Sequence, residues 1–156
     1  MAETLAVVGV VSSIVGLVDF GSKVLHRLIN DFQSSRGEIP ETFKHVKEEL
    51  PILLETLNQT KLAVEKGSIK EETKKALLLV VNRCQTQITL LDDLIRKSLP
   101  QEDDSWRKKT SKAIFSLRQD AKVTKITATL RMHIQGLTYY RLSASSALQT
   151  ANGMAV

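Results

Sequence analysis

The 156-residue sequence predicts an all-α protein, an up-and-down helical bundle of four to five helices with a long C-terminal helix. Apolar residues recur at spacings of three and four along almost the whole chain, and no stretch sustains the period-two alternation of a strand. The only aromatic residues are four Phe, two Tyr and one Trp, so the core must consist mainly of Leu, Ile, Val and Ala. The length suits a single domain, which we place at residues 1–150, with a frayed tail at 151–156.

The composition excludes several classes of protein. An apolar content of 42% is too high for a disordered chain, and three Pro with seven Gly are too few for a collagen-like or linker-rich one. A single Cys excludes an internal disulfide framework and a cysteine-rich zinc module. It fits a reducing compartment such as the cytoplasm.

The first predicted helix contains fifteen consecutive uncharged residues, Thr4 to Val18. No basic segment precedes this run, and it continues into an amphipathic helix, so it is not a secretory signal. At about 1.5 Å per residue the run spans about 22 Å, which is short for about 30 Å of membrane hydrocarbon. By length alone, a buried core helix of the bundle is the favoured interpretation.

Small residues form a stripe along this helix, because Ala2, Ala6, Gly9, Ser13 and Gly16 are spaced by four, three, four and three residues. Each interior glycine costs about 0.5–1 kcal/mol relative to Ala, so core packing alone gains little from this composition. Small residues at such spacing let helix backbones approach closely. We expect the stripe to seat the helix tightly within the bundle at rest, with membrane entry or self-association as a second role of the same surface.

The second half of the first helix, Lys23 to Phe32, has an ordinary amphipathic pattern. Its charged residues, Arg27 and Asp31 among them, are expected to be solvated. Gly21-Ser22 is a plausible flexible joint between the two halves.

The second predicted helix is the clearest of the four. Its apolar stripe consists of Phe43, Val46, Leu50, Leu53 or Leu54, Leu57 and Val64. Pro40 suits the first helical turn, where its missing N–H is tolerated. Pro51 lies inside the periodic run, so we expect either a kink there or a break into a short helix and a longer one.

The third predicted helix begins with a capping-box pattern, Ser68 to Glu71, just after Gly67, a natural terminator of the preceding helix. Its apolar seam consists of Leu77, Val81, Cys84, Ile88, Leu91 and Ile95. Within that seam Cys84 is expected to be a small buried hydrophobe rather than a reactive thiol.

The fourth predicted helix follows an acidic loop, with Asp104 or Ser105 as its N-cap. Its apolar pattern runs through Trp106, Ile114, Leu117, Ala121, Ile126, Leu130, Ile134, Leu137 and Ala144, which makes a helix of about forty residues. The connections Ser34–Ile39, Lys66–Lys70 and Leu99–Ser105 are short, so neighbouring helices should pack antiparallel.

The net charge of +5 arises entirely from residues 101–156, which hold nine bases against four acids. The candidate basic face consists of Arg107, Lys108, Lys109, Lys112, Arg118, Lys122 and Lys125. A solvated helix face explains such a cluster as well as an anionic partner does. Among anionic partners, a membrane surface is favoured over nucleic acid. Nucleic acid would favour aromatics interleaved with the bases or a recognition-helix motif, but of Trp106, Tyr139 and Tyr140 the two tyrosines lie far from the cluster.

Residues with catalytic or metal-binding potential are scattered. His26, His45 and His133 fall on three different predicted helices, and none has a second ligand at the spacing of a metal site. Adjacent carboxylates such as Asp92-Asp93 point apart on a helix. With no phosphate-binding loop and no nucleophile-base pair in the sequence, we expect neither an enzyme nor a cofactor.

Four segments of the chain carry a family pattern: Leu5–Ile14 followed by Val18–Phe20, then Ile39–Phe43, Glu49–Leu54 and Lys112–Leu117. They resemble the fungal SesA-type domains found at the N-termini of NLR-like proteins with NACHT or other P-loop NTPase modules. Those domains are similar to the HeLo and HeLo-like domains. The resemblance extends to about Tyr140 and involves hydrophobic and small residues rather than a catalytic signature.

The resemblance implies a non-enzymatic cell-death effector of fungal innate immunity or incompatibility. Such effectors expose a hydrophobic N-terminal helix, oligomerise and permeabilise the plasma membrane, so this protein is expected in the cytoplasm and, once activated, at the plasma membrane. By position, the helix residues concerned are Glu3, Leu5, Ala6, Gly9, Ser13, Ile14, Gly16 and Val18.

The implied partners are anionic membrane lipid, further copies of the chain, and an NLR-type NTPase module in cis or in trans. No such module follows Val156, so the chain is either a free-standing effector or an excised domain. The alternative function is a signalling adaptor that recruits a partner through bundle-to-bundle contacts and never enters a membrane.

Overall fold

The computed structural model describes residues 2–99 and 119–154, and these confirm the all-α prediction, with no strand among them. The elements are α1 (Ala2–His26), the π-helix η1 (Arg27–Asp31), α2 (Phe32–Arg36), α3 (Glu41–Glu65), α4 (Glu71–Ser98) and α6 (Asp120–Met154). The predicted N-cap of the last helix and its stretch Trp106 to Leu117 lie outside the described residues. Four long helical segments therefore form the bundle.

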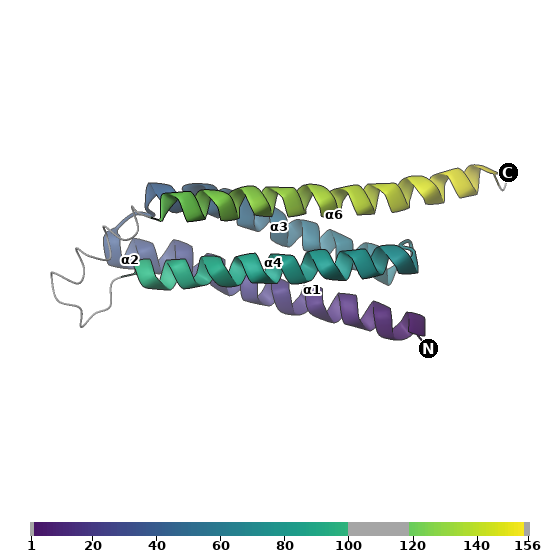
Figure 1. Ribbon diagram of the computed structural model, residues 1–156, viewed down its shortest axis with the longest axis horizontal. Helices are drawn as coiled ribbons and strands as arrows, with labels where there is room; N and C mark the ends of the chain where they lie inside the picture. The colour runs from purple at the N-terminus through teal and green to yellow at the C-terminus, as the bar shows by residue number, and fades with distance from the viewer. Residues whose placement is uncertain (1, 100–118, 155–156) are drawn as a thin grey trace.

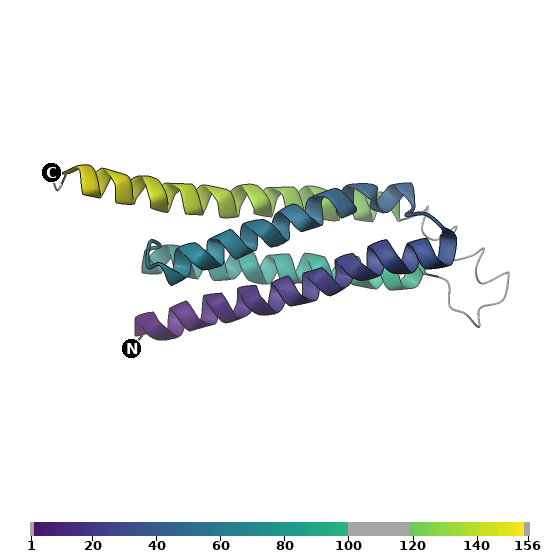
Figure 2. The same ribbon diagram turned by 180° about the vertical axis from the view of Figure 1, so that it is seen from behind.

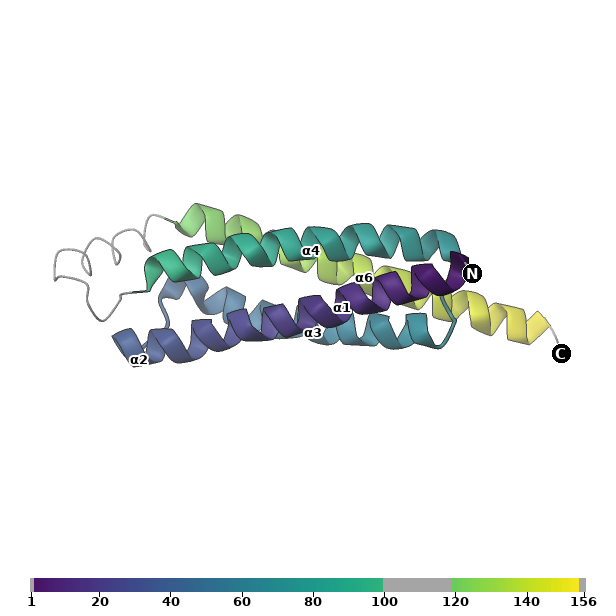
Figure 3. The ribbon, with the colours of Figure 1, turned by 90° about the horizontal axis from the view of Figure 1, so that it is seen from below.

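The four segments stand at the corners of a square in the order α1, α3, α6, α4 (Figures 1 and 3). Consecutive segments run in opposite directions, as predicted. The packing order differs from the prediction, because α3 and α4 occupy opposite corners although only five residues, 66–70, connect them. The neighbours across two sides of the square, α1 with α4 and α3 with α6, are parallel pairs, which ion pairs between the helices help to hold (below).

Both ends of the chain lie at the same end of the bundle, and α6 projects beyond the other helices there (Figures 1 and 2). We expected an irregular tail from Ala151, but α6 remains helical to Met154. Ala147, Leu148 and Gln149 are good helix formers. They favour continuation of the helix, which ends one residue after Gly153, a poor helix former.

The first helical segment departs from α geometry at Arg27–Asp31, where five residues form the π-helix η1. The predicted joint at Gly21-Ser22 is therefore wrong, because both residues lie within the uninterrupted helix α1. The segment ends at Gly37, whose φ of 79° is left-handed and whose N–H donates to the Gln33 carbonyl at 2.9 Å.

Two further local predictions need correction. Helix α3 is not broken at Pro51: it continues to Glu65, because the residues after Pro51 carry on the buried stripe that packs into the core. Helix α4 begins at Glu71 with Lys70 as its N-cap and no side-chain cap. The Ser68 hydroxyl instead donates to the Ala63 carbonyl at 2.9 Å, which closes the end of α3 next to the left-handed Gly67.

The core is aliphatic, as the composition requires. The predicted seam of α4 is fully buried at Leu77, Val81, Cys84, Ile88, Leu91 and Ile95, and the predicted stripe of α3 is buried from Phe43 to Val64. In α6, Ile126, Leu130 and Leu137 are buried, whereas Ile134 is half-buried. Ala121 is exposed, because Val123 takes the inward position in the first turn of α6.

The N-terminal helix as the candidate functional site

The buried face of α1 includes Val10, Ile14, Leu17 and Val24 and continues with Leu28 of η1, each at most 3% exposed. This confirms that the first helix packs within the bundle. Val18, on the flank of that face, is half-buried against the core. The backbone of Glu3, Leu5 and Ala6 belongs to α1, but their side chains lie outside the described ones.

The small-residue stripe of α1 does not make the close helix contact that we predicted for the resting state. A Cβ atom added at Gly9 or at Gly16 would meet no atom within 4 Å outside the local helix. Gly16 is exposed, and Ser13 and Gly9 are half-buried. Larger neighbours on the adjacent face, such as Ile14, hold the helix against the core and leave space beside the glycines.

Gly21 is the glycine that brings α1 close to the bundle. A Cβ atom on Gly21 would lie 2.6 Å from Leu54 Cδ2 of α3 and 3.6 Å from Ile88 Cδ1 of α4. Sequence reasoning missed this role, although a signal existed: Gly21 continues the apolar spacing of Ile14 and Leu17 by one further turn. The helix-contact glycine of α1 therefore lies outside the predicted small-residue stripe.

The described part of α1 and its continuation is long and apolar enough to cross a membrane by length and composition, over Gly9–Ser35. This is a longer apolar helix than the fifteen-residue run suggested. A core helix of a soluble bundle passes the same test when it is mostly buried. The most apolar window here is 28% buried, while nine of the 25 residues of α3 are buried, and Val15 is 51% exposed. The most apolar helix is thus incompletely enclosed.

An ion pair joins η1, which continues α1, to α4. The Arg27 guanidinium donates through Nη1 to Asp92 Oδ1, and Arg96 Nε lies 3.1 Å from Asp92 Oδ2. The Asp92 side chain is 9% exposed and that of Arg27 is 26% exposed, so the prediction of a solvated Arg27 is wrong. Asp92 follows Leu91 at the edge of the buried seam, which was the only signal of its burial.

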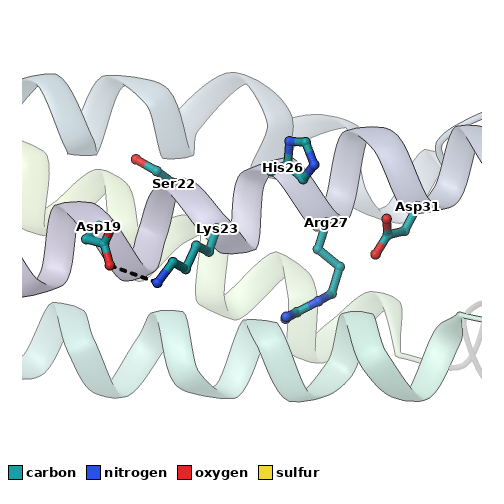
Figure 4. Close-up of a pocket in the computed structure, with 6 residues that line it drawn as sticks. All are labelled: Asp19, Ser22, Lys23, His26, Arg27 and Asp31. Atoms are coloured by element: carbon teal, nitrogen blue, oxygen red, sulfur yellow. Dashed lines mark ion pairs between the residues drawn. The ribbon is translucent and has the colours of Figure 1, made fainter.

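Polar and charged residues of α1 and η1 line a shallow hollow of 410 Å³. Figure 4 shows Arg27 reaching towards the neighbouring helix, whereas Lys23 turns back to Asp19 of its own helix at 3.1 Å. The Asp19 and Lys23 side chains are both more than 60% exposed. Arg27 is therefore the basic residue of this hollow that links two helices.

Of the candidate basic face, Lys122 and Lys125 are described, and both are exposed on α6 one turn apart. The other members, Arg107, Lys108, Lys109, Lys112 and Arg118, lie outside the described residues. The acid nearest to the lysines in sequence, Asp120, accepts a hydrogen bond from the Thr42 hydroxyl of α3. Further along α6, Arg131 Nε lies 2.6 Å from Glu49 of α3, which ties these two parallel helices together.

Cys84 of α4 and His133 of α6 are both buried. Burial raises the pKa of the Cys84 thiol to about 12, so the thiol is neutral. Burial, followed by the positive charge of Arg83, lowers the pKa of His133. In the parts of the chain that the structure describes, no group of three or more His, Cys, Asp and Glu residues could hold a metal ion.

Comparison with known proteins matches residues 11–137 to the SesA model, described as the N-terminal domain on NACHT NTPases and P-loop NTPases. The match covers most of the four-helix bundle. Neither a curated protein nor a solved structure matches the chain. Since the family model spans well over half of the sequence, the chain belongs to the SesA family of N-terminal domains on NACHT and P-loop NTPases.

Proposed function

We propose that this domain is a non-catalytic cell-death effector of an NLR-type immunity or incompatibility protein of fungi. On activation, α1 leaves the bundle, copies of the domain associate, and the plasma membrane of the cell is permeabilised. The observation that supports this most is the incomplete enclosure of α1, since 28% of its most apolar window is buried. The matched family, N-terminal domains on NTPases, fits an effector controlled by an NTPase module in the same polypeptide.

The packing of α1 explains why a membrane is needed for its release. Withdrawing Val10, Ile14 and Leu17 into water would cost about 5–9 kcal/mol, taking about 1.5–3 kcal/mol for each fully buried side chain. Lipid tails offer these side chains an apolar environment in place of the core. Transfer into a bilayer therefore compensates for a step that is unfavourable in water.

The open space beside Gly9 and Gly16 supports self-association after release. The two glycines lie seven residues apart, and neither is used for a close contact in the resting bundle. In lipid, where burial of apolar surface gives helices no drive to associate, small residues allow close backbone packing. The stripe of Gly9, Ser13 and Gly16 is thus available for helix contacts between copies.

The exposed lysines of α6 support an anionic lipid partner. Lys122 and Lys125 lie one turn from each other on α6. They belong to residues 101–156, which carry the net charge of +5. Each such charge near an anionic leaflet contributes about 1 kcal/mol. We propose that the full face, from Arg107 to Lys125, orients the domain on the inner leaflet of the plasma membrane.

Dye leakage from anionic liposomes tests the proposal directly. The variants Gly9→Leu and Gly16→Leu are well suited, because an added Cβ atom meets no atom within 4 Å at either position, and we expect the resting bundle to fold. We expect both to leak at least tenfold less than the parent protein. Val15→Leu, which enlarges an exposed side chain elsewhere on α1, is the matched control and should leak normally.

Undiminished leakage by a folded Gly9→Leu, Gly16→Leu double variant would overturn the role of the small-residue stripe. Absence of leakage by the parent protein at every lipid composition would overturn the membrane function itself. Circular dichroism on each variant establishes that the bundle is folded.

A signalling adaptor is the second candidate, and exposed leucines on α4 favour it. Leu79 and Leu90 are 59% and 50% exposed, and their spacing of eleven residues puts them on one side of the helix. An adaptor would use such a surface for bundle-to-bundle contacts. If a Leu79→Glu, Leu90→Glu variant loses signalling in cells while Gly9→Leu keeps it, the adaptor function is favoured over the membrane one.

A further inference from the structure

The contacts of the first helical segment differ between its two ends. Between Val10 and Leu17 the contacts with the bundle are made by aliphatic side chains of the core. At the other end, Arg27 forms its ion pair with Asp92 of α4, and Phe32 packs against Phe43 of α3 with ring centroids 5.3 Å apart. The second end therefore has specific partners on both neighbouring helices.

The edge of α1 that runs towards Arg27 becomes more tightly occupied along its length. Ser13, Phe20 and Arg27 are spaced by seven residues and so lie on one side of the helix. Near the start of this edge, Gly9 and Gly16 leave open space, whereas Phe20 packs against the core and Arg27 is ion-paired. Along this edge, the helix is therefore held less closely near Gly9 and Gly16 than near Arg27.

The π-helix η1 begins at the residue that makes the ion pair. A π turn bonds each N–H to the carbonyl five residues back, so it interrupts the regular α hydrogen-bond pattern. The helical backbone continues through η1 into α2, but the hydrogen-bond register changes there. We expect detachment of the helix from its N-terminal end to stop at this change of register.

We propose that Arg27, Asp92 and the π turn form a latch that fixes how much of the first helix can leave the bundle. Residues upstream of about Gly21 detach together, while Arg27 to Phe32 remain anchored on α4 and α3. This control rests on the proposed function, in which α1 is released. The latch itself is a property of the bundle in water and can be measured without a membrane.

Asp92 provides a matched pair of variants, because it binds two arginines of different origin. Arg27 reaches it from η1, whereas Arg96 reaches it from the same helix, one turn away. Arg27→Gln removes the link between the helices, and Arg96→Gln removes a partner of the same carboxylate without touching that link. Lys23→Gln, which breaks only the exposed pair with Asp19 within α1, is a second control.

Hydrogen exchange measured by mass spectrometry on the full chain tests the latch. In the parent protein we expect amides before Gly21 to exchange as one group, faster than amides 24–33. In Arg27→Gln the amides 24–33 should exchange about tenfold faster, an effect in the range of a charge-assisted hydrogen bond. Arg96→Gln and Lys23→Gln should leave them within about twofold of the parent.

Equal effects of Arg27→Gln and Arg96→Gln, or no effect of Arg27→Gln, would overturn the latch. If Arg27→Gln does not fold, Arg27→Lys replaces it, because lysine keeps the charge and loses the forked geometry. In Arg27→Lys the amides 24–33 should exchange faster than in the parent, by less than tenfold. Exchange at the parent rate would again overturn the proposal. If Arg27→Gln shows the expected faster exchange while neither the parent nor any variant causes liposome leakage, the latch is supported and the membrane function is contradicted.

Discussion

Gly21 of α1 lies against Leu54 of α3 so closely that a Cβ atom on Gly21 would be 2.6 Å from Leu54 Cδ2. This contact sets how near the first helix can approach the bundle, whereas Gly9 and Gly16 of the same helix face open space. Glycines that look alike in the sequence therefore have opposite structural roles.

Substitutions at Gly21 and Gly16 should change stability in opposite directions. Gly21→Val overpacks a buried site, so the free energy of unfolding should fall by about 1–3 kcal/mol. Gly16→Ala removes the backbone entropy cost of a helix-interior glycine at an open position, so it should rise by about 0.5–1 kcal/mol. Urea denaturation measures both, and a loss of stability in Gly16→Ala would contradict the open environment described for it.

The Cys84 thiol should be inert in the folded protein. Burial raises its pKa to about 12, so almost none of it is the reactive thiolate at pH 8. Alkylation by iodoacetamide should be at least about hundredfold slower in buffer than in 8 M urea, where the pKa returns to about 8.5. Labelling at equal rates in the two solvents would show that the α4 seam opens readily around Cys84.

His133 should make the bundle sensitive to acid. Its folded-state pKa lies below the ordinary value of 6.5, so the unfolded chain binds the proton first as the pH falls. The stability contributed by the neutral ring is therefore present above about pH 6.5 and is lost as the pH falls through the folded-state pKa, with a slope of at most about 1.4 kcal/mol per pH unit.

Thermal unfolding between pH 7.5 and 4.5 checks this dependence. His133→Leu should flatten the curve, because the titrating group is removed, and His45→Gln, at an exposed site on α3, should not. A curve for His133→Leu as steep as that of the parent would assign the acid sensitivity to other groups.

Charge reversal on α6 should weaken attachment to anionic vesicles. Lys122→Glu with Lys125→Glu should reduce binding by at least about thirtyfold at low salt, since each lysine contributes about 1 kcal/mol and each glutamate adds repulsion. Lys66→Glu with Lys75→Glu changes the charge equally at the opposite end of the bundle and is the control. Vesicle sedimentation measures binding, and equal losses in the two variants would mean that overall charge, not this face, attracts the lipid.

The core of the bundle could be predicted from spacing because burial follows helical periodicity. The six residues of the α4 seam are all buried, and Cys84 among them is the small hydrophobe that the pattern indicated. Periodicity also contained the position of Gly21, which continues the buried line from Ile14 and Leu17. The composition led us instead to assign the close helix contact to Gly9 and Gly16, because these two glycines lie within the apolar run.

The Arg27–Asp92 ion pair could not be predicted in the same way. It depends on α1 and α4 being parallel neighbours, and an amphipathic pattern shows which face of a helix is buried but not which helix covers it. The capping box at Ser68 failed for a related reason: its hydroxyl has a second acceptor, the Ala63 carbonyl, once Gly67 turns the chain back. A local sequence pattern identifies which hydrogen bonds and ion pairs a residue can form. The tertiary arrangement of the helices and turns determines which of them does form.

The first residues of α1 and the last residues of α6 lie at one end of the bundle, and α6 carries its helix past that end (Figure 2). Because α1 and α6 occupy opposite corners of the square, a partner attached to the projecting end of α6 would lie across this end of the bundle from the start of α1. The Arg27–Asp92 ion pair and the exposed Lys122 and Lys125 belong to the other end. Under the proposed function, one end of the bundle releases the helix, and the other end holds it and contacts the lipid.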